Sequence, residues 1–287
     1  MTARTAVNLL RVLPRERLTR LVGRVTEAEV PRALLQPILA LYTRAFRVAL
    51  DEAVIPPEGF RSFNQYFTRE LRPGVHSVAQ DPSAVVSPAD GRLEDHGSID
   101  PQSAFLVKGQ RYDTASLLGS EAEAERYRGG WFSVVYLSPR DYHRVHSPVE
   151  GRVRMARHLP GTLFPVNALG IQHVPQLFAR NERVVVEVDS PFGPVAVVFV
   201  GAFVVGKISL AFDGPPRPPH GGPVIERRYR DQEAPSLTRG GDLGAFLLGS
   251  TVVVLLPPRD GGHWMAPDIT VPGPLRMGQV LARWSAS

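Results

Sequence analysis

Near the C-terminus, a serine follows a glycine where a glycine-rich segment meets an apolar one. Gly249 and Ser250 lie between residues 240–244, which include three glycines, and the apolar run 252–256. That run is short, β-branched and followed by two prolines, so it predicts a buried strand. A serine hydroxyl can attack the carbonyl of the residue before it, and elimination from the resulting ester leaves a pyruvoyl group. A glycine at position 249 allows the backbone to bend towards the attacking hydroxyl. An ordinary junction between a loop and a strand would show the same sequence pattern.

Two histidines and a carboxylate could assist such a reaction. His143 and His146 precede a Ser-Pro pair, which predicts an extended segment instead of a helix that would align them as a metal pair, so we expect no metal. A histidine can take a proton from a hydroxyl near neutral pH, and a carboxylate can orient its ring. Asp90, in a predicted turn, is one candidate carboxylate, and Glu150 is its competitor.

These two carboxylates occupy equivalent places in an internal repeat. Residues 87–93 (Ser-Pro-Ala-Asp-Gly-Arg-Leu) match residues 147–153 (Ser-Pro-Val-Glu-Gly-Arg-Val), and residues 190–195 are a weaker copy. Between residues 84 and 256 the pattern is mainly strands and turns, with short helices expected at 114–118 and 174–178. We therefore predict an α+β fold whose core is a mainly antiparallel β barrel or sandwich with an internal pseudo-repeat.

The N-terminal part of the chain is basic and amphipathic. Of the net charge of +5, the first fifty residues carry +6, from nine arginines and three acidic residues. Apolar positions at helical spacing opposite basic ones predict helices lying in the headgroup plane of a membrane, although the stripe could also pack on the main domain. The longest uncharged stretch of these fifty residues, 33–43, is too short to span a bilayer. We divide the chain into a membrane-associating helical segment, 1–55, and a β-rich catalytic domain, 56–287.

Several motifs spread along the chain carry a family resemblance. They are Leu13-Pro14, Phe63-Asn64-Gln65-Tyr66-Phe67, Arg69-Glu70-Leu71-Arg72, Ser87-Pro88-Ala89-Asp90-Gly91, residues 136–146, residues 160–167, residues 177–183 and Leu248-Gly249-Ser250-Thr251. In these motifs the chain resembles the bacterial phosphatidylserine decarboxylase proenzymes, nearly from end to end. One departure is residues 242–246, Asp-Leu-Gly-Ala-Phe, where the family usually has an acidic residue followed by methionine.

The resemblance implies self-cleavage between Gly249 and Ser250. The products would be a β chain, residues 1–249, and an α chain, residues 250–287, that begins with a covalent pyruvoyl cofactor. It also implies that Asp90, His146 and Ser250 form the cleavage triad, with His146 as base, and that His143 or His146 handles protons during turnover. The implied reaction converts phosphatidylserine to phosphatidylethanolamine and CO₂ in phospholipid biosynthesis.

The resemblance also implies where the protein works and with what. Its substrate lies in an anionic membrane, so we expect a peripheral protein on the cytoplasmic face of the cell membrane. We expect a homodimer of αβ units, and no nucleic acid, because aromatic platforms and a reading motif are missing.

Two alternative predictions assign the protein to other functional classes. One is a Ser-His-Asp lipid hydrolase, but the Gly-x-Ser-x-Gly elbow is absent because Val252 occupies its last position. The other is a non-catalytic membrane-docked module, which would leave Asp90, His146 and Ser250 without a role.

Overall fold

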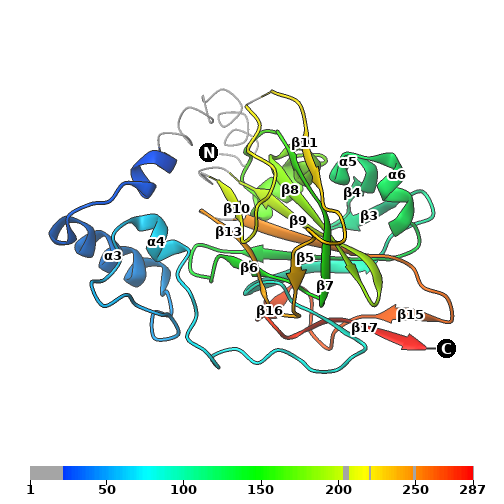
Figure 1. The fold of residues 1–287 in the computed structure, drawn as a ribbon, viewed down its shortest axis with the longest axis horizontal. Helices are drawn as coiled ribbons and strands as arrows, with labels where there is room; N and C mark the ends of the chain where they lie inside the picture. Colours follow the sequence, from blue (N-terminus) through cyan, green and yellow to red (C-terminus); the bar gives the residue numbers. More distant parts are fainter. Residues whose placement is uncertain (1–21, 203–206, 220, 248–249, 287) are drawn as a thin grey trace.

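The computed structural model describes residues 22–202, 207–219, 221–247 and 250–286, apart from the side chains of residues 168 and 169. Its helices are α3 (Arg32–Phe46), α4 (Phe63–Phe67), α5 (Thr114–Leu118), α6 (Glu121–Ala124), the 3₁₀ helix η1 (Glu125–Tyr127), α7 (Ala168–His173) and α8 (Leu177–Arg180). Helices α3 and α4 lie together to one side of the sheets, and α5 and α6 lie on the opposite side (Figure 1).

The centre of the fold is a nine-stranded antiparallel sheet with the order β11-β7-β8-β9-β14-β5-β2-β16, in which β12 also pairs with β7. Its strands are β2 (Gly91–Ser98), β5 (Trp131–Leu137), β7 (Gly151–Leu159), β8 (Arg183–Ser190), β9 (Gly193–Gly201), β11 (Ile225–Arg228), β12 (Ser236–Leu237), β14 (Ser250–Leu256) and β16 (Gly273–Leu275). Smaller sheets join β1 (Ala84–Val86), β17 (Val280–Ala286) and β15 (Gly262–Met265), then β10 (Ile208–Leu210), β13 (Asp242–Phe246) and β6 (Arg144–His146), and finally β3 (Ala104–Val107) and β4 (Gln110–Asp113).

Strand β14 lies in the middle of the large sheet. All seven of its residues are buried, as expected for a continuous apolar run covered on both faces. Its first residue, Ser250, stands opposite Leu137 of β5 and Gly201 of β9. The predicted strand is therefore confirmed, and it begins at the serine.

The α+β class and the antiparallel pairing are confirmed. Of the predicted barrel or sandwich, the barrel is wrong, and the internal pseudo-repeat stays a prediction. Within the described residues every sheet is open. The two ends of the large sheet explain this. β11 carries the charged residues Glu226, Arg227 and Arg228, and charges of this kind blunt an edge strand. β16 contains Pro274, which cannot donate a ladder hydrogen bond to a further strand.

The two turns of the sequence repeat contact each other reciprocally. The amide of Val86 donates to the carbonyl of Pro148 at 3.0 Å, and the amide of His146, sixty residues further on, donates to the carbonyl of Pro88 at 2.7 Å. In each turn the serine hydroxyl donates to the carbonyl two residues ahead. These bonds place the turn that carries Asp90 against the strand that carries His146.

A second, smaller apolar cluster forms around α3 and α4. It contains Leu35 and Leu39 of α3 together with Tyr66 and Phe67 of α4, and therefore draws on both sides of the predicted boundary at residue 55, which stays a prediction. The helical pattern expected after residue 34 is confirmed, and residues 1–21 lie outside the described residues.

Helix α3 also has an apolar face that points away from this cluster. We call Leu34, Ile38 and Leu41 the outward face of α3; their exposed fractions are 61%, 54% and 70%. No helix within the described residues is long and apolar enough to cross a membrane.

Candidate active site

Ser250 carries a buried hydroxyl without a hydrogen-bond partner. The residue is fully buried at the start of β14, and its Oγ bonds to nothing among the described residues. Leaving a buried polar group unsatisfied costs about 1–3 kcal/mol, so such groups call for a functional explanation. Leu248 and Gly249 lie outside the described residues, and so does the geometry of the bond predicted to be cleaved.

His143 is a buried, neutral imidazole with one free nitrogen. Its Nδ1 donates to the carbonyl of Asp141 at 2.8 Å, which leaves the lone pair on Nε2. That atom has no partner among the described residues, and the ring packs 4.0 Å from the ring of Phe67, measured between centroids. Complete burial is the main reason that the pKa of His143 falls to about 3, and the nearby Arg69 lowers it further.

His146 on β6 is also held in one tautomer. Its Nδ1 donates to the carbonyl of Gly240 at 2.8 Å, so Nε2 accepts a hydrogen bond from the hydroxyl of Tyr142 at 3.0 Å. Burial lowers the pKa of His146, although the bond to Gly240 opposes this shift. The ring is therefore an unprotonated base near neutral pH, and its basic nitrogen is covered by Tyr142.

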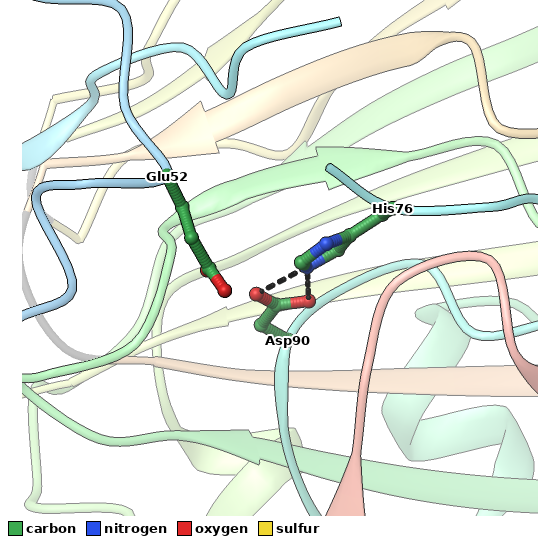
Figure 2. Close-up of side chains that lie close together, drawn as sticks. All are labelled: Glu52, His76 and Asp90. Carbon is green, nitrogen blue, oxygen red and sulfur yellow. Dashed lines mark hydrogen bonds and ion pairs between the residues drawn. The ribbon is translucent and has the colours of Figure 1, made fainter. Parts of the chain in front are cut away.

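Asp90 is paired with a histidine that the sequence did not single out. Nε2 of His76 lies 2.8 Å from both carboxylate oxygens of Asp90, as Figure 2 shows, and the amide of Met277 donates to one of them. The hydrogen bond that His76 donates to the Asp90 carboxylate is the main cause of the raised pKa of His76. Among the described residues no hydrogen bond joins Asp90 to His146. The competing carboxylate, Glu150, is exposed.

The predicted triad is thus brought together only in part. The backbone of the Asp90 turn contacts the backbone of His146 through Pro88, while the Asp90 side chain is engaged with His76. The cleavage roles of Asp90, His146 and Ser250, and the turnover role of His143, stay predictions.

A third acidic group approaches the Asp90–His76 pair. The Glu52 carboxylate faces that of Asp90 in Figure 2, and one ligand atom from each of the three side chains lies within 4.8 Å of the others. Such a trio could in principle hold a metal ion. However, an ion pair accounts for the short contacts of His76, and Glu52 lies 3.3 Å from Arg276, whose cation disfavours a second one there. We therefore assign no metal to it.

Sequence reasoning missed the side chains that hold the candidates in place. His76 is fourteen residues from Asp90, so no local pattern connects them. Tyr142 lies inside the motif of residues 136–146, but its hydrogen bond to Nε2 of His146 is evident only from the fold. Phe67, which the sequence placed within a motif, is buried and packs against the ring of His143.

The arrangement offers a hydroxyl nucleophile, two neutral imidazoles and a fixed carboxylate. Ser250 and His143 each present a buried polar atom without a partner, and His146 is deprotonated in a defined tautomer. Such groups can move protons in a site from which water is largely excluded. The chemistry that fits them is proton transfer coupled to covalent catalysis.

The chain is similar to known proteins over most of its length. The family model described as phosphatidylserine decarboxylase matches residues 63–283. The chain is 41% identical to the phosphatidylserine decarboxylase proenzyme of Stenotrophomonas maltophilia (strain R551-3) over 94% of its own length and 96% of the relative. It is 40% identical to the protein of that name from Acidovorax ebreus (strain TPSY), with 98% of both chains covered, and 42% identical to that of Bordetella petrii (strain ATCC BAA-461 / DSM 12804 / CCUG 43448), with 94% and 93% covered. With this extent of match, the chain belongs to the phosphatidylserine decarboxylase family.

Proposed function

We propose that this chain is a proenzyme that cleaves itself between Gly249 and Ser250 and then converts phosphatidylserine to phosphatidylethanolamine and CO₂. The observation that supports this most directly is the buried, unpartnered Ser250 hydroxyl at the start of the central strand of a family member. The two neighbouring strands fix the backbone of Ser250 by pairing, opposite Leu137 and Gly201. This arrangement fits a serine that becomes the pyruvoyl group.

Maturation begins with loss of the Ser250 proton. In our proposal the neutral His146 accepts it at Nε2 after Tyr142 swings away, and Asp90, held by His76, stabilises the resulting cation. The oxygen then bonds to the carbonyl carbon of Gly249 and the peptide C–N bond breaks, giving an ester and a free amine. Loss of the Cα proton expels the Gly249 carboxylate, and water replaces the nitrogen, which leaves as ammonia.

During turnover the chain's own residues bind the lipid and move its protons. A pyruvoyl group at position 250 supplies a ketone that binds the substrate amine and takes up the electron pair left when CO₂ departs. His143 suits proton transfer because its Nε2 is free, deprotonated and shielded from water. An anionic substrate bound beside the ring would oppose the effect of burial and raise this pKa, so that His143 could then take up a proton and deliver it to the carbon that lost CO₂.

Because the substrate is a membrane lipid, the outward face of α3 can serve as a membrane-contacting surface. Three large apolar side chains at spacings of four and three residues form a stripe that can enter the headgroup region of a bilayer. Arg32 and Arg44 on the same helix can bind anionic lipids, each with about 1 kcal/mol. We propose that this helix seats the protein peripherally on the cytoplasmic face of the membrane. The homodimer of αβ units stays a prediction, which sedimentation of the purified protein can test.

Intact mass spectrometry tests the proposed function. The wild-type protein should give two chains, of which the α chain, residues 250–287, is lighter than its sequence by one ammonia. The Ser250→Ala variant should remain a single chain and form no phosphatidylethanolamine. A wild-type protein that stays full-length and still releases CO₂ would refute the proposal, and release of a fatty acid by an uncleaved chain would support the lipid hydrolase instead.

A further inference from the structure

A cavity of about 440 Å³ opens beside Asp90, and its charged lining consists of four arginines and three acidic residues. Arg69 lies among its walls, and Arg47, Arg140 and Arg276 contribute exposed or largely exposed side chains. Gly91 and Leu275 belong to the same lining, so the cavity adjoins the sheet where β2 meets β16.

Arg69 is a buried cation without an anionic partner. The residue is 5% exposed, its Nε has no hydrogen-bond partner, and no ion pair involves it within the described residues. Two other arginines are equally buried. Arg157 pairs with Glu123 and Glu226, and Arg183 donates to several backbone carbonyls. Burying an unpaired charge is costly, so the difference indicates that Arg69 is built to receive an anion from outside the chain.

Each acidic side chain of the cavity has a bonding partner other than Arg69. Asp90 is bonded to His76, Asp141 accepts from the amide and hydroxyl of Ser138, and Glu52 lies beside Arg276. The guanidinium carbon of Arg69 lies 5.7 Å from the centroid of the Tyr66 ring. Glu52 and Asp141 therefore partly balance Arg276 and Arg140, at 3.3 and 3.5 Å. Asp90 favours the charge of Arg69 without forming an ion pair with it, so Arg69 and Arg47 keep their charge without an ion-pair partner among the described residues.

The cavity lies close enough to Ser250 for one small headgroup to reach both. Gly91 precedes Arg92, which stands opposite Tyr136, and the next residue of that strand stands opposite Ser250. Two strand spacings therefore separate Gly91 from Ser250, about 10 Å. The charge of Arg69 is also felt at His143, whose pKa it lowers. Binding at Arg69 and chemistry at Ser250 are thus parts of one region.

We propose that this cavity binds the phosphodiester of the substrate headgroup, with Arg69 as the buried ligand and Arg47, Arg140 and Arg276 around it; the inference rests on the proposed function. A guanidinium fork matches two phosphate oxygens. Four covalent bonds, about 5 Å, separate the amine nitrogen of phosphatidylserine from its phosphorus, and a further ~4 Å leads to a guanidinium carbon. The total is comparable with the distance of about 10 Å from Gly91, on the cavity lining, to Ser250.

The phosphodiester fits this cavity better than the carboxylate of the same headgroup. The carboxylate becomes neutral CO₂ in the reaction, so a strong ion pair to it would stabilise the ground state more than the transition state and slow the reaction. The phosphodiester keeps its charge throughout and can anchor the lipid at no such cost.

A binding experiment tests the cavity without any pyruvoyl group. In the uncleaved Ser250→Ala protein, soluble glycerophosphoserine and glycerophosphoethanolamine should bind with similar affinity, and free serine should bind far more weakly. Adding Arg69→Gln should lower the affinity for both phosphodiesters by about tenfold to a hundredfold, as for a lost charged hydrogen bond. The inference is overturned if serine binds as well as glycerophosphoserine, if Arg69→Gln changes nothing, or if inorganic phosphate binds more tightly than either phosphodiester.

Kinetics on the mature enzyme provide the second test. Arg69→Gln should raise KM for phosphatidylserine by a similar factor with a smaller change in kcat, while Arg69→Lys should recover part of the loss. Arg140→Gln changes an exposed side chain and should raise KM more weakly. This variant replaces Arg69→Gln as the test of the cavity if Arg69→Gln does not fold. Arg128→Gln, an exposed arginine paired with Glu125 outside the cavity, is the matched control. Unchanged KM in both Arg69→Gln and Arg140→Gln would overturn the inference.

The two proposals can fail separately. Chain scission, read from intact mass in every variant, reports on the proposed function and does not require lipid binding. A wild-type protein that is never cleaved would refute the proposed function. The binding data on Ser250→Ala would still decide whether the cavity binds a phosphodiester.

Discussion

The buried His143 should make the folded protein sensitive to acid. Its pKa is lowered from 6.5 to about 3, chiefly by burial. Between these two values the unfolded chain binds a proton that the folded chain does not. The stabilisation is therefore fully present above the ordinary pKa and is lost as the pH falls, at about 1.4 kcal/mol for each pH unit. From about pH 6.5 to about pH 4.5, His143 alone should lower the free energy of unfolding by about 3 kcal/mol.

Urea unfolding of two variants isolates this contribution. Both carry Ser250→Ala, so that the chain stays in one piece, and one also carries His143→Gln. On acidification over that pH range, the variant with His143→Gln should lose about 3 kcal/mol less of its free energy of unfolding than the variant that keeps His143. His263→Gln is the control, because that side chain is exposed and should leave the pH slope unchanged. Parallel pH profiles for the two proteins would refute the reasoning that His143 stays neutral inside the fold.

Three further outcomes are expected. His146→Ala should block scission, read on a denaturing gel, and normal maturation would show that another group is the base. His76→Gln removes the ion pair of Asp90 and should slow scission by about tenfold or more, as expected for one lost charged hydrogen bond; an unchanged rate would separate the pair from maturation. Replacing the outward face of α3 with serines should weaken binding to anionic vesicles in a flotation assay by well over tenfold, since each apolar side chain contributes about 1.5–3 kcal/mol when buried. Scission should be unaffected, and loss of both properties would mean that the face is structural.

Strong local patterns predicted the central elements well. The apolar run before Pro257 is β14, and the runs at 132–137, 183–188 and 195–200 lie within β5, β8 and β9. The helix expected at 114–118 is α5, capped by the side chain of Asp113. In each case the periodicity or the apolar run agrees with the tertiary environment, so the local signal suffices.

Other features depended on contacts that no short segment contains. The helix expected at 174–178 begins only at Leu177, as α8. Val174 precedes a proline, which disfavours helical backbone, and Gln176 has a left-handed conformation with φ of 54°. The sheet stays open because of its edge strands, which were not recognised as edges. The partner of Asp90 and the unpaired state of Arg69 both arise from packing between segments that are distant along the chain.

The place of β14 in the sheet decides what a break before Ser250 would do to the molecule. The shorter fragment would begin with a strand already hydrogen-bonded on both sides, and its later strands β16 and β17 pair with β2 and β1 of the longer fragment. The two fragments would therefore stay associated, because separating them would break the strand pairing on which both depend. A fresh chain end would be created inside the protein and anchored there from the moment it formed, so the new reactive group would need no docking step to find its position.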